Sequence, residues 1–292
     1  MEVFGYRGLV GSFLVRMEIV HTPTAFFRAL NVINGDKTNL DTLSSNNFDS
    51  STGAPELRIY YHDDALVVVN KPAGMLVHRS GIDARETVFL MQTLRDQLGQ
   101  HVYPVHRLDK PTSGLVIFAL SSEIARELSL MFERGSVDKS YLAFVRGHTP
   151  KSLSIDHPLR DEVDSKGRKT KEGVVREAAT ELATLASWTV PEPVDRYPEA
   201  RYSKVQLKPI TGRYRQLRRH MKHISHPILG DVRYGKGTHN RFIEERVGVK
   251  RLWLHAHSLT FSHPDTQNMM TIHSEVPDDF SQMETWLEQA SL

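Results

Sequence analysis

Residues 106–114 contain the densest group of side chains that could do chemistry in this sequence. They read His-Arg-Leu-Asp-Lys-Pro-Thr-Ser-Gly and lie between two apolar stretches, residues 102–105 and 115–120, which are predicted to form strands. Burying so many polar groups is unfavourable unless they bind one another or a ligand. Asp109 is therefore a candidate catalytic carboxylate, although an isolated loop aspartate is more often a turn residue or an ion-pair partner.

A second polar segment, residues 211–220, opens a predicted helix that buries Leu217 and Met221. Arg218 lies one residue round from Leu217, so its guanidinium can reach sideways into a cleft. Residues 208–251 contain twelve lysines and arginines against three acidic residues, with tyrosines among them. A charge run is usually a solvated face, but this excess with interleaved aromatic residues is typical of a surface that binds phosphates.

A third polar segment, Lys139-Ser140-Tyr141, stands at the start of a predicted strand. By itself Tyr141 is more simply a core aromatic residue with a tethered hydroxyl group. Histidines also recur at every third residue from His220 to His226, which raises the question of a metal site. Pro227 ends that helix and no carboxylate ligand stands at a useful spacing, so we expect structural and ligand-facing histidines and no metal.

The apolar pattern from Leu57 onward predicts strands and helices in irregular alternation. The predicted strands cover residues 66–69, 102–105, 115–120, 141–145, 177–186, 202–207, 251–261 and 269–273. The predicted helices cover residues 87–98, 122–134, 211–226 and 279–289. Residues 151–198 show little periodicity, so we expect an elaborated loop region there with a basic hairpin-like tract at 166–171. The regular rhythm of a parallel sheet is missing, which favours an α+β (mixed α/β) fold with a mixed or antiparallel sheet flanked by helices.

The composition excludes several classes of protein. The 292 residues can bury a sizeable core, and 37 Lys and Arg against 35 Asp and Glu leave a net charge of +2 that favours no particular partner. The absence of cysteine excludes disulfides, thiolate zinc sites and thiol nucleophiles, and it suits a cytoplasmic protein. The apolar runs are too short to span a bilayer. We expect residues 1–55 to form a peripheral or disordered extension ahead of a domain at 56–292.

Taken together, these motifs resemble the RluA family of RNA pseudouridine synthases. Residues 106–114 match the family's His-Arg-Leu-Asp-x-x-Thr-Ser-Gly motif at every fixed position, and further family motifs stand at 70–72, 139–141, 211–220 and 226–231. The resemblance covers residues 57–290. It implies a pseudouridine synthase fold, with a mostly antiparallel, bent central sheet flanked by helices and loops around a basic cleft. It also implies an RNA substrate and no cofactor.

The resemblance assigns a role to each site residue. Asp109 becomes the nucleophile, Arg218 its partner, Tyr141 the residue that stacks on the target base, and Arg107 the side chain that fills the gap left by a flipped uridine. The remaining substrate-binding residues that it implies are His106, Thr112, Arg213, Arg215, Gln216 and Arg219. In one departure, Arg215 stands where the family usually has histidine. Arginine keeps a positive charge and can hold a phosphate with two hydrogen bonds.

Within the family, residues 76–80, 91–100 and 216–220 are most similar to members that act on uridine 65 in the T stem of tRNA. No S4-type RNA-binding domain is recognisable ahead of the catalytic core, which suits the same subgroup. We therefore expect a cytoplasmic tRNA pseudouridine synthase that acts as a monomer, without a membrane or an obligate protein partner. Two alternatives stay open: a synthase of this family that acts on 23S ribosomal RNA, and a non-catalytic RNA-binding or RNA-folding module.

Overall fold

A computed structural model describes residues 56–78, 87–162 and 173–291, which all fall within one structural unit of the chain, residues 47–292. Ten of its strands form one sheet. They are β1 (Ile59–His62), β2 (Leu66–Lys71), β3 (Tyr103–Pro104), β4 (Ser113–Ala119), β5 (Asp138–Arg146), β6 (Ser152–Asp156), β9 (Ala179–Val190), β10 (Ala200–Pro209), β11 (Leu254–Ser262) and β12 (Met269–His273). Two short strands, β7 (Leu159–Arg160) and β8 (Val175–Arg176), form a separate hairpin-like pair.

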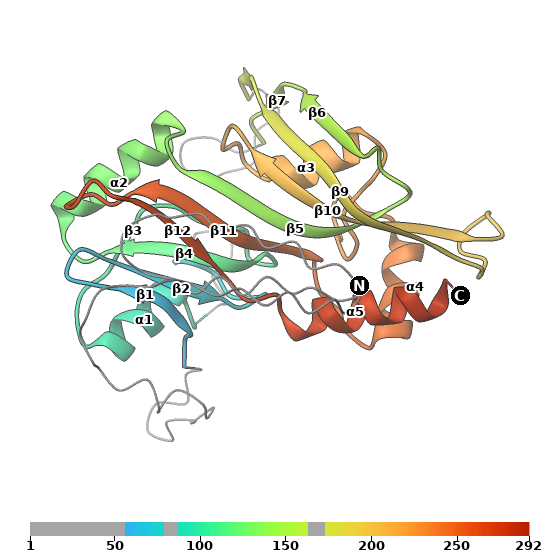
Figure 1. Cartoon of the computed structure of the whole chain (residues 1–292), viewed down its shortest axis with the longest axis horizontal. Coiled ribbons are helices and arrows are strands. Elements are labelled where there is room, and N and C mark those ends of the chain that lie inside the picture. The colour runs from blue at the N-terminus through green and yellow to red at the C-terminus, as the bar shows by residue number, and fades with distance from the viewer. Residues whose placement is uncertain (1–55, 79–86, 163–172, 292) are drawn as a thin grey trace, which may run out of the picture. The chain divides into compact units, whose positions relative to one another are not determined.

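The large sheet has the strand order β1-β2-β4-β11-β5-β10-β9-β6, with β12 beside β11 and β3 beside β4 (Figure 1). Its neighbouring strands are antiparallel except β4 and β11, which run parallel over a short register. That parallel contact joins two halves of the sheet, β1-β2-β4 and β11-β5-β10-β9-β6. The predicted α+β class with a mostly antiparallel sheet is confirmed.

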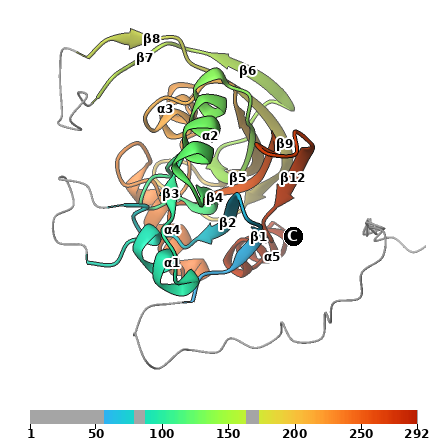
Figure 2. The same cartoon turned by 90° about the vertical axis from the view of Figure 1, so that its left-hand side faces the viewer.

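The first half of the sheet is covered on both faces, which explains why residues 66–69 of β2 and 115–119 of β4 are continuously apolar rather than alternating. Val67, Val69 and the alternate residues of β4 pack with helix α1 (Leu90–Leu98). Leu66 and Val68 face the opposite way and pack in the cluster that contains Leu128 of helix α2 (Ser122–Arg134). The two helices accordingly lie on opposite sides of β2 and β4 (Figure 1 and Figure 2). A strand buried on both faces reads as a continuous hydrophobic run.

The second half is built around the largest core cluster. Three helices, α3 (Gln216–His223), α4 (Gly237–Val247) and α5 (Asp278–Ala290), contribute buried side chains to it together with β5, β9, β10 and β11. Phe144, Trp253 and Phe280 lie at its centre, with ring centroids 5.4–5.8 Å apart, a spacing at which aromatic pairs attract one another. This packing fixes α3, the helix that carries Arg218, against the sheet.

Gly114 makes the parallel contact between the two halves possible. It pairs with Ala256 of β11 and has a φ of +116°, a backbone conformation that side chains with a Cβ rarely adopt. A Cβ on this residue would lie 2.2 Å from the Ala256 carbonyl oxygen. The glycine that ends the polar segment 106–114 is therefore required by the close approach of two backbones.

Replacing Gly114 with alanine is expected to lower the free energy of unfolding by about 3 kcal/mol or more, because the strained φ and the clash with β11 add together. Gly99→Ala is the matched control: Gly99 also has a positive φ, +66°, but a Cβ there meets nothing within 4 Å. That control should lose only about 1–2 kcal/mol. Urea unfolding of the two variants measures the difference, and equal losses would contradict the role given to the β4–β11 contact.

A buried histidine also spans this junction. His255 of β11 is 1% exposed, with Nδ1 2.8 Å from the Ser113 hydroxyl and Nε2 2.7 Å from the Ser274 hydroxyl. Burial, together with the neighbouring charge of Arg251, lowers the pKa of His255 to about 3. The ring is therefore neutral at physiological pH, and it anchors Ser113 just beyond the loop that carries Asp109.

This histidine predicts acid sensitivity of the fold. In the unfolded chain His255 regains a pKa of about 6.5, so the unfolded state binds more protons between about pH 6.5 and pH 3. The stability that His255 contributes is therefore complete above pH 6.5 and falls as the pH drops, at up to about 1.4 kcal/mol per pH unit. Urea unfolding between pH 7 and pH 5 should show a shallower pH dependence in His255→Gln than in the wild type. The exposed His101→Gln serves as the control and should leave the slope unchanged.

Several sequence predictions differ from the structure. The described part of residues 151–198 contains β6 to β9, of which the sequence predicted only the strand that corresponds to β9; β6 is an edge strand with exposed side chains, so it lacks an apolar pattern. The helix predicted from residue 211 begins at Gln216. Strand β1 and helix α4 were not predicted, because β1 has no fully buried residue and α4 buries only His239 and Ile243. The basic hairpin-like tract expected at residues 166–171 and the extension expected at residues 1–55 lie outside the described residues.

Candidate active site

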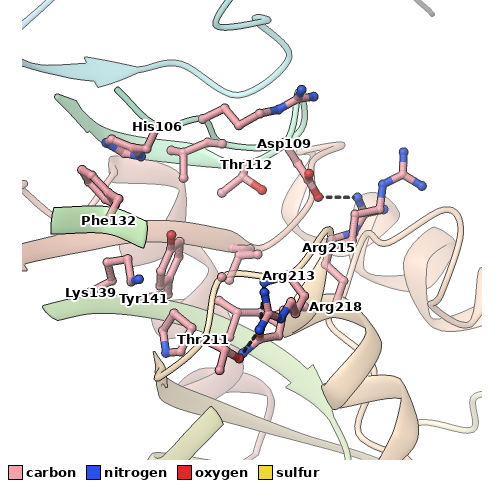
Figure 3. Close-up of a pocket in the computed structure, with 17 residues that line it drawn as sticks. His106, Asp109, Thr112, Phe132, Lys139, Tyr141, Thr211, Arg213, Arg215 and Arg218 are labelled. Carbon is pink, nitrogen blue, oxygen red and sulfur yellow. Dashed lines mark hydrogen bonds and ion pairs between the residues drawn. The ribbon is translucent and has the colours of Figure 1, made fainter. Parts of the chain in front are cut away.

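A cavity of about 320 Å³ opens where the two halves of the sheet meet. Its walls come from the loop between β3 and β4, from β5, from the end of β10 with the following turn, and from α3 (Figure 3). Nine of the ten sequence-predicted site residues line it: His106, Arg107, Asp109, Thr112, Tyr141, Arg213, Arg215, Gln216 and Arg218. Phe132 of α2 and Lys139 of β5 also contribute to the wall.

Asp109 and Arg218 form an ion pair inside this cavity. Arg218 Nη1 donates a 2.8 Å hydrogen bond to Asp109 Oδ2, and the two side chains are 5% and 20% exposed respectively (Figure 3). An ion pair with a buried guanidinium is screened far less than one on the surface. One side of the Asp109 carboxylate therefore faces the cavity, and the other faces the fixed positive charge of Arg218.

Arg218 is itself held by a second carboxylate. Its Nε and Nη2 donate to Asp231 Oδ2 and Oδ1 at 2.7 and 2.9 Å, and Asp231 is 1% exposed. Burial alone would raise the pKa of Asp231, but the hydrogen bonds and charge of Arg218 and two backbone N–H groups lower it below its usual value. Burial opposes the charge of Arg218 in the same way, and its two carboxylate partners raise the pKa of Arg218 above its usual value. The three groups form one fixed charged unit.

Tyr141 faces the same cavity from β5 (Figure 3). Burial, and then the negative charge of Asp109, raise the pKa of Tyr141 well above its usual value. The phenol therefore stays protonated at physiological pH and presents a neutral ring beside Asp109. A neutral aromatic face of this kind can stack on a base taken out of an RNA helix.

Lys71 at the end of β2 fixes the loop that carries Asp109. This lysine is fully buried, and its Nζ donates to the carbonyl oxygens of Pro72, Met75 and Lys110 at 2.9, 2.7 and 3.0 Å. Three acceptors match the three donors of an ammonium group. Burial lowers the pKa of Lys71 to about 7, while the charge of Asp109 acts in the opposite direction. The segment 70–72 thereby joins β2 to the Asp109 loop.

His106 and Gln216 line the cavity, but His106 Nε2 and the Gln216 side-chain amide are bound within the protein. His106 Nε2 accepts from the backbone N–H of Ile117 at 3.0 Å, and its ring stacks on Phe132. Burial lowers the pKa of His106 to about 3, so the ring is neutral. Gln216 Oε1 accepts from the hydroxyl of Thr211 and the N–H of Arg213, and its Nε2 donates to residues 179 and 180. Both residues shape the cavity wall.

The side-chain bonds of Gln216 also explain why α3 begins at residue 216 and not at residue 211, where the sequence predicted its start. Its side chain holds residues 211–213 in a turn, and Arg215 adopts a left-handed conformation with φ of +54° as the residue before the helix. The Arg215 guanidinium lies 4.6 Å from the centre of the Tyr214 ring, and its Nε is buried without a hydrogen-bond partner among the described residues. A strained backbone and an unpaired donor are features that often mark a binding site.

Arg219 is the predicted site residue that does not line the cavity. Its Nη2 donates to the Arg160 carbonyl oxygen at 2.8 Å, and its Nε lies 3.7 Å from Glu162. On the same helix, His220 is hydrogen-bonded through Nδ1 to the Thr180 hydroxyl and through Nε2 to the His157 carbonyl oxygen. The His223 ring stacks on the His157 ring. Among the described residues no group of three His, Asp or Glu side chains is placed to hold a metal ion.

The sequence pattern did not assign roles to Asp231 and Lys71, although both stand in motifs that were singled out. A charged residue close to the end of an apolar run, such as Lys71 two positions after three consecutive valines, can signal a buried, paired charge. The partners themselves are far apart in the sequence and become visible only in the fold.

Together, this fold and this aspartate–arginine site define an RNA-modifying enzyme class. The sequence profile of the family described as RNA pseudouridylate synthase matches residues 65–223, which is more than half of the chain. The chain therefore belongs to the RNA pseudouridylate synthase family. Within the described residues, no helix is long and apolar enough to span a membrane.

Relatives of the chain carry a more specific name. The tRNA pseudouridine synthase C of Pasteurella multocida is 55% identical over 218 residues, covering 74% of this chain and 90% of that protein. The protein of the same name from Haemophilus influenzae is 50% identical over 229 residues, covering 78% and 96%. Among solved structures, human RNA pseudouridylate synthase domain containing 1 is 28% identical with a TM-score of 0.59, covering 76% of this chain and 84% of that one.

Proposed function

We propose that this chain converts a uridine of tRNA, at position 65 in the T stem, to pseudouridine, with Asp109 as the nucleophile. The observation that carries the proposal is the Asp109–Arg218–Asp231 unit, which presents a fixed carboxylate to a cavity of about 320 Å³. The extensive identity to relatives named tRNA pseudouridine synthase C supports tRNA as the substrate.

The reaction breaks the N1–C1′ bond of the uridine, turns the uracil, and forms a C5–C1′ bond, while a proton leaves C5 and N1 gains one. A retaining glycosidase uses a second carboxyl group to protonate its leaving group and to activate water. Here the base is retained and water must be excluded, so one carboxylate suffices. Arg218 supports that carboxylate at any physiological pH, because its guanidinium remains charged.

A stacked base cannot reach the cavity, so the target nucleotide must be flipped out of the RNA, at a cost of roughly a few kcal/mol. Arg107, which is exposed at the rim two residues before Asp109, is proposed to fill the vacated space. Tyr141 is proposed to stack on the flipped uracil. The basic side chains of Arg213 and Arg215 suit the flanking phosphates, and Thr112 lies between Asp109 and the Tyr141 side of the cavity (Figure 3).

The geometry gives three other predicted residues supporting roles. His106 and Gln216 are proposed to act on the substrate through the shape of the wall, since His106 Nε2 and the Gln216 amide have protein partners. Arg219 is proposed to contact RNA outside the cavity. We further propose that residues 56–292 form the catalytic domain after an N-terminal extension, and that the enzyme works as a cytoplasmic monomer without a cofactor.

Tritium release from RNA labelled at uridine C5 tests the proposal. The purified chain should release tritium from unmodified tRNA, and mapping of the product should place pseudouridine at position 65. Turnover on 23S ribosomal RNA with none on tRNA would reject the proposed substrate in favour of the first alternative. Binding of both RNAs without turnover of either would favour a non-catalytic RNA-binding module.

A further inference from the structure

In the loop after α3, residues 231–236, backbone N–H groups donate hydrogen bonds to the side chain of Asp231, the residue that also holds Arg218. Asp231 Oδ1 accepts the backbone N–H groups of Arg233 and Tyr234, both at 2.9 Å, in addition to its bond from Arg218. The N–H of Gly235 donates to the Asp231 carbonyl oxygen at 3.0 Å. The position of Tyr234 is thereby tied to the position of Asp231.

Tyr234 lies over the guanidinium of Arg218. The Cζ atom of Arg218 is 5.3 Å from the centre of the Tyr234 ring, within the range of a cation–π contact. The edge of the guanidinium is bound by two carboxylates, Asp109 through Nη1 and Asp231 through Nε and Nη2. Those three hydrogen bonds occupy the edge of the guanidinium, and an aromatic ring packed beside the group opposes its tilting.

The hydroxyl end of Tyr234 is anchored on another part of the chain. It donates a 2.7 Å hydrogen bond to Glu162 Oε1 and accepts one from Arg233 Nε at 3.2 Å. Glu162 also forms an ion pair with Arg233 at 3.0 Å. Burial and the bond to Glu162 raise the pKa of Tyr234, so its phenol stays neutral. The ring is therefore held at both ends, by the backbone at Asp231 and by the side chain of Glu162.

The geometry points to Tyr234 as a positioning residue that holds the guanidinium plane of Arg218 so that Nη1 meets Asp109 in the reacting state. This inference rests on the proposed function, since it concerns the same aspartate. Tyr234 does not line the cavity, and its contact with Arg218 is the one through which it acts on Asp109. The ring is the functional part, and the hydroxyl contributes only by fixing the ring.

Steady-state kinetics on a tRNA transcript test the inference with variants of graded chemistry. Tyr234→Leu removes the aromatic face and should lower kcat about tenfold or more, with KM within about twofold. Tyr234→Met, whose side chain is longer and unbranched but also lacks a ring, should behave in the same way and provides a second unstacked variant if the leucine protein does not fold. Tyr234→Phe keeps the ring and should restore kcat to within about threefold of the wild type. A change confined to KM, or equal losses in the leucine and phenylalanine variants, would overturn the inference.

A spectroscopic measurement separates this inference from the proposed function. In the wild type and in Tyr234→Phe, the ring current of residue 234 should place the Arg218 Nε–H resonance upfield of its position in Tyr234→Leu. That proton should also exchange slowly with water. In Tyr234→Leu and Tyr234→Met the upfield shift should vanish and exchange should become faster. The resonance is identified by its loss in Arg218→Lys. Absence of the upfield shift in the wild type would overturn the inference, whereas an inactive wild type with the shift present would reject only the proposed substrate.

Discussion

Asp109→Asn is expected to lower the rate of tritium release from tRNA by at least about 10⁴-fold while tRNA binding persists. The asparagine has the same shape and can still accept a hydrogen bond from Arg218, but it lacks the negative charge of the nucleophile. The loss should appear in single-turnover measurements with enzyme in excess, so that slow product release does not mask it. Filter binding or fluorescence anisotropy provides the affinity for tRNA.

The matched control for this variant is Asp138→Asn, which removes an exposed carboxylate at the start of β5. It should leave the rate within about twofold, because exposed charges contribute little. Substantial tritium release by Asp109→Asn would remove Asp109 from the role of nucleophile. Loss of tRNA binding along with activity would instead show that the substitution disturbs the site as a whole.

Arg218→Ala is expected to have the second largest effect, and it should change both stability and rate. It would leave Asp231, which is 1% exposed, without its cationic partner, and an uncompensated buried charge costs about 3–5 kcal/mol of folding stability. The rate should fall by about 10²–10³-fold, since a fixed charge beside the reacting group is lost. Urea unfolding and single-turnover kinetics measure the two effects separately.

A double substitution distinguishes the two roles of Arg218. In Arg218→Met with Asp231→Asn, the buried site carries no unpaired charge from Asp231, so most of the stability should return. The rate should remain low, because Asp109 still lacks its positive partner. Recovery of the rate together with stability would mean that Arg218 acts only as a structural residue.

The sequence was most informative where the chemistry is concentrated in a short motif. Asp109 could be singled out because residues 106–114 are polar between two apolar segments, and residues 115–119 of the second segment indeed lie within the fully buried β4. The helix that carries Arg218 was also predicted, from the spacing of Leu217 and Met221. Local patterns of this kind depend on burial along one element, which a sequence displays directly.

Other features depend on partners that are distant in the sequence. Nothing near Arg219 indicates that its guanidinium turns toward Arg160, and nothing near Gln216 indicates that its amide is saturated by residues 179 and 180. Strand β6 escaped prediction for a related reason: at the edge of a sheet, with both faces largely exposed, the backbone pairing with β9 decides the structure rather than side-chain burial. Such tertiary contacts have no local signature.

The contact between β4 and β11 has a consequence for how this enzyme becomes active during synthesis. Asp109 and Arg218 are separated by 109 positions, and β11 follows α3 in the chain, so the two charged groups meet only after nearly the whole domain has left the ribosome. Contacts between such distant segments form late and slowly compared with local ones. A nascent or truncated chain without β11 would lack the β4–β11 contact beside the Asp109 loop. The Asp109–Arg218 pair is therefore expected in its final geometry only in a chain that already contains β11.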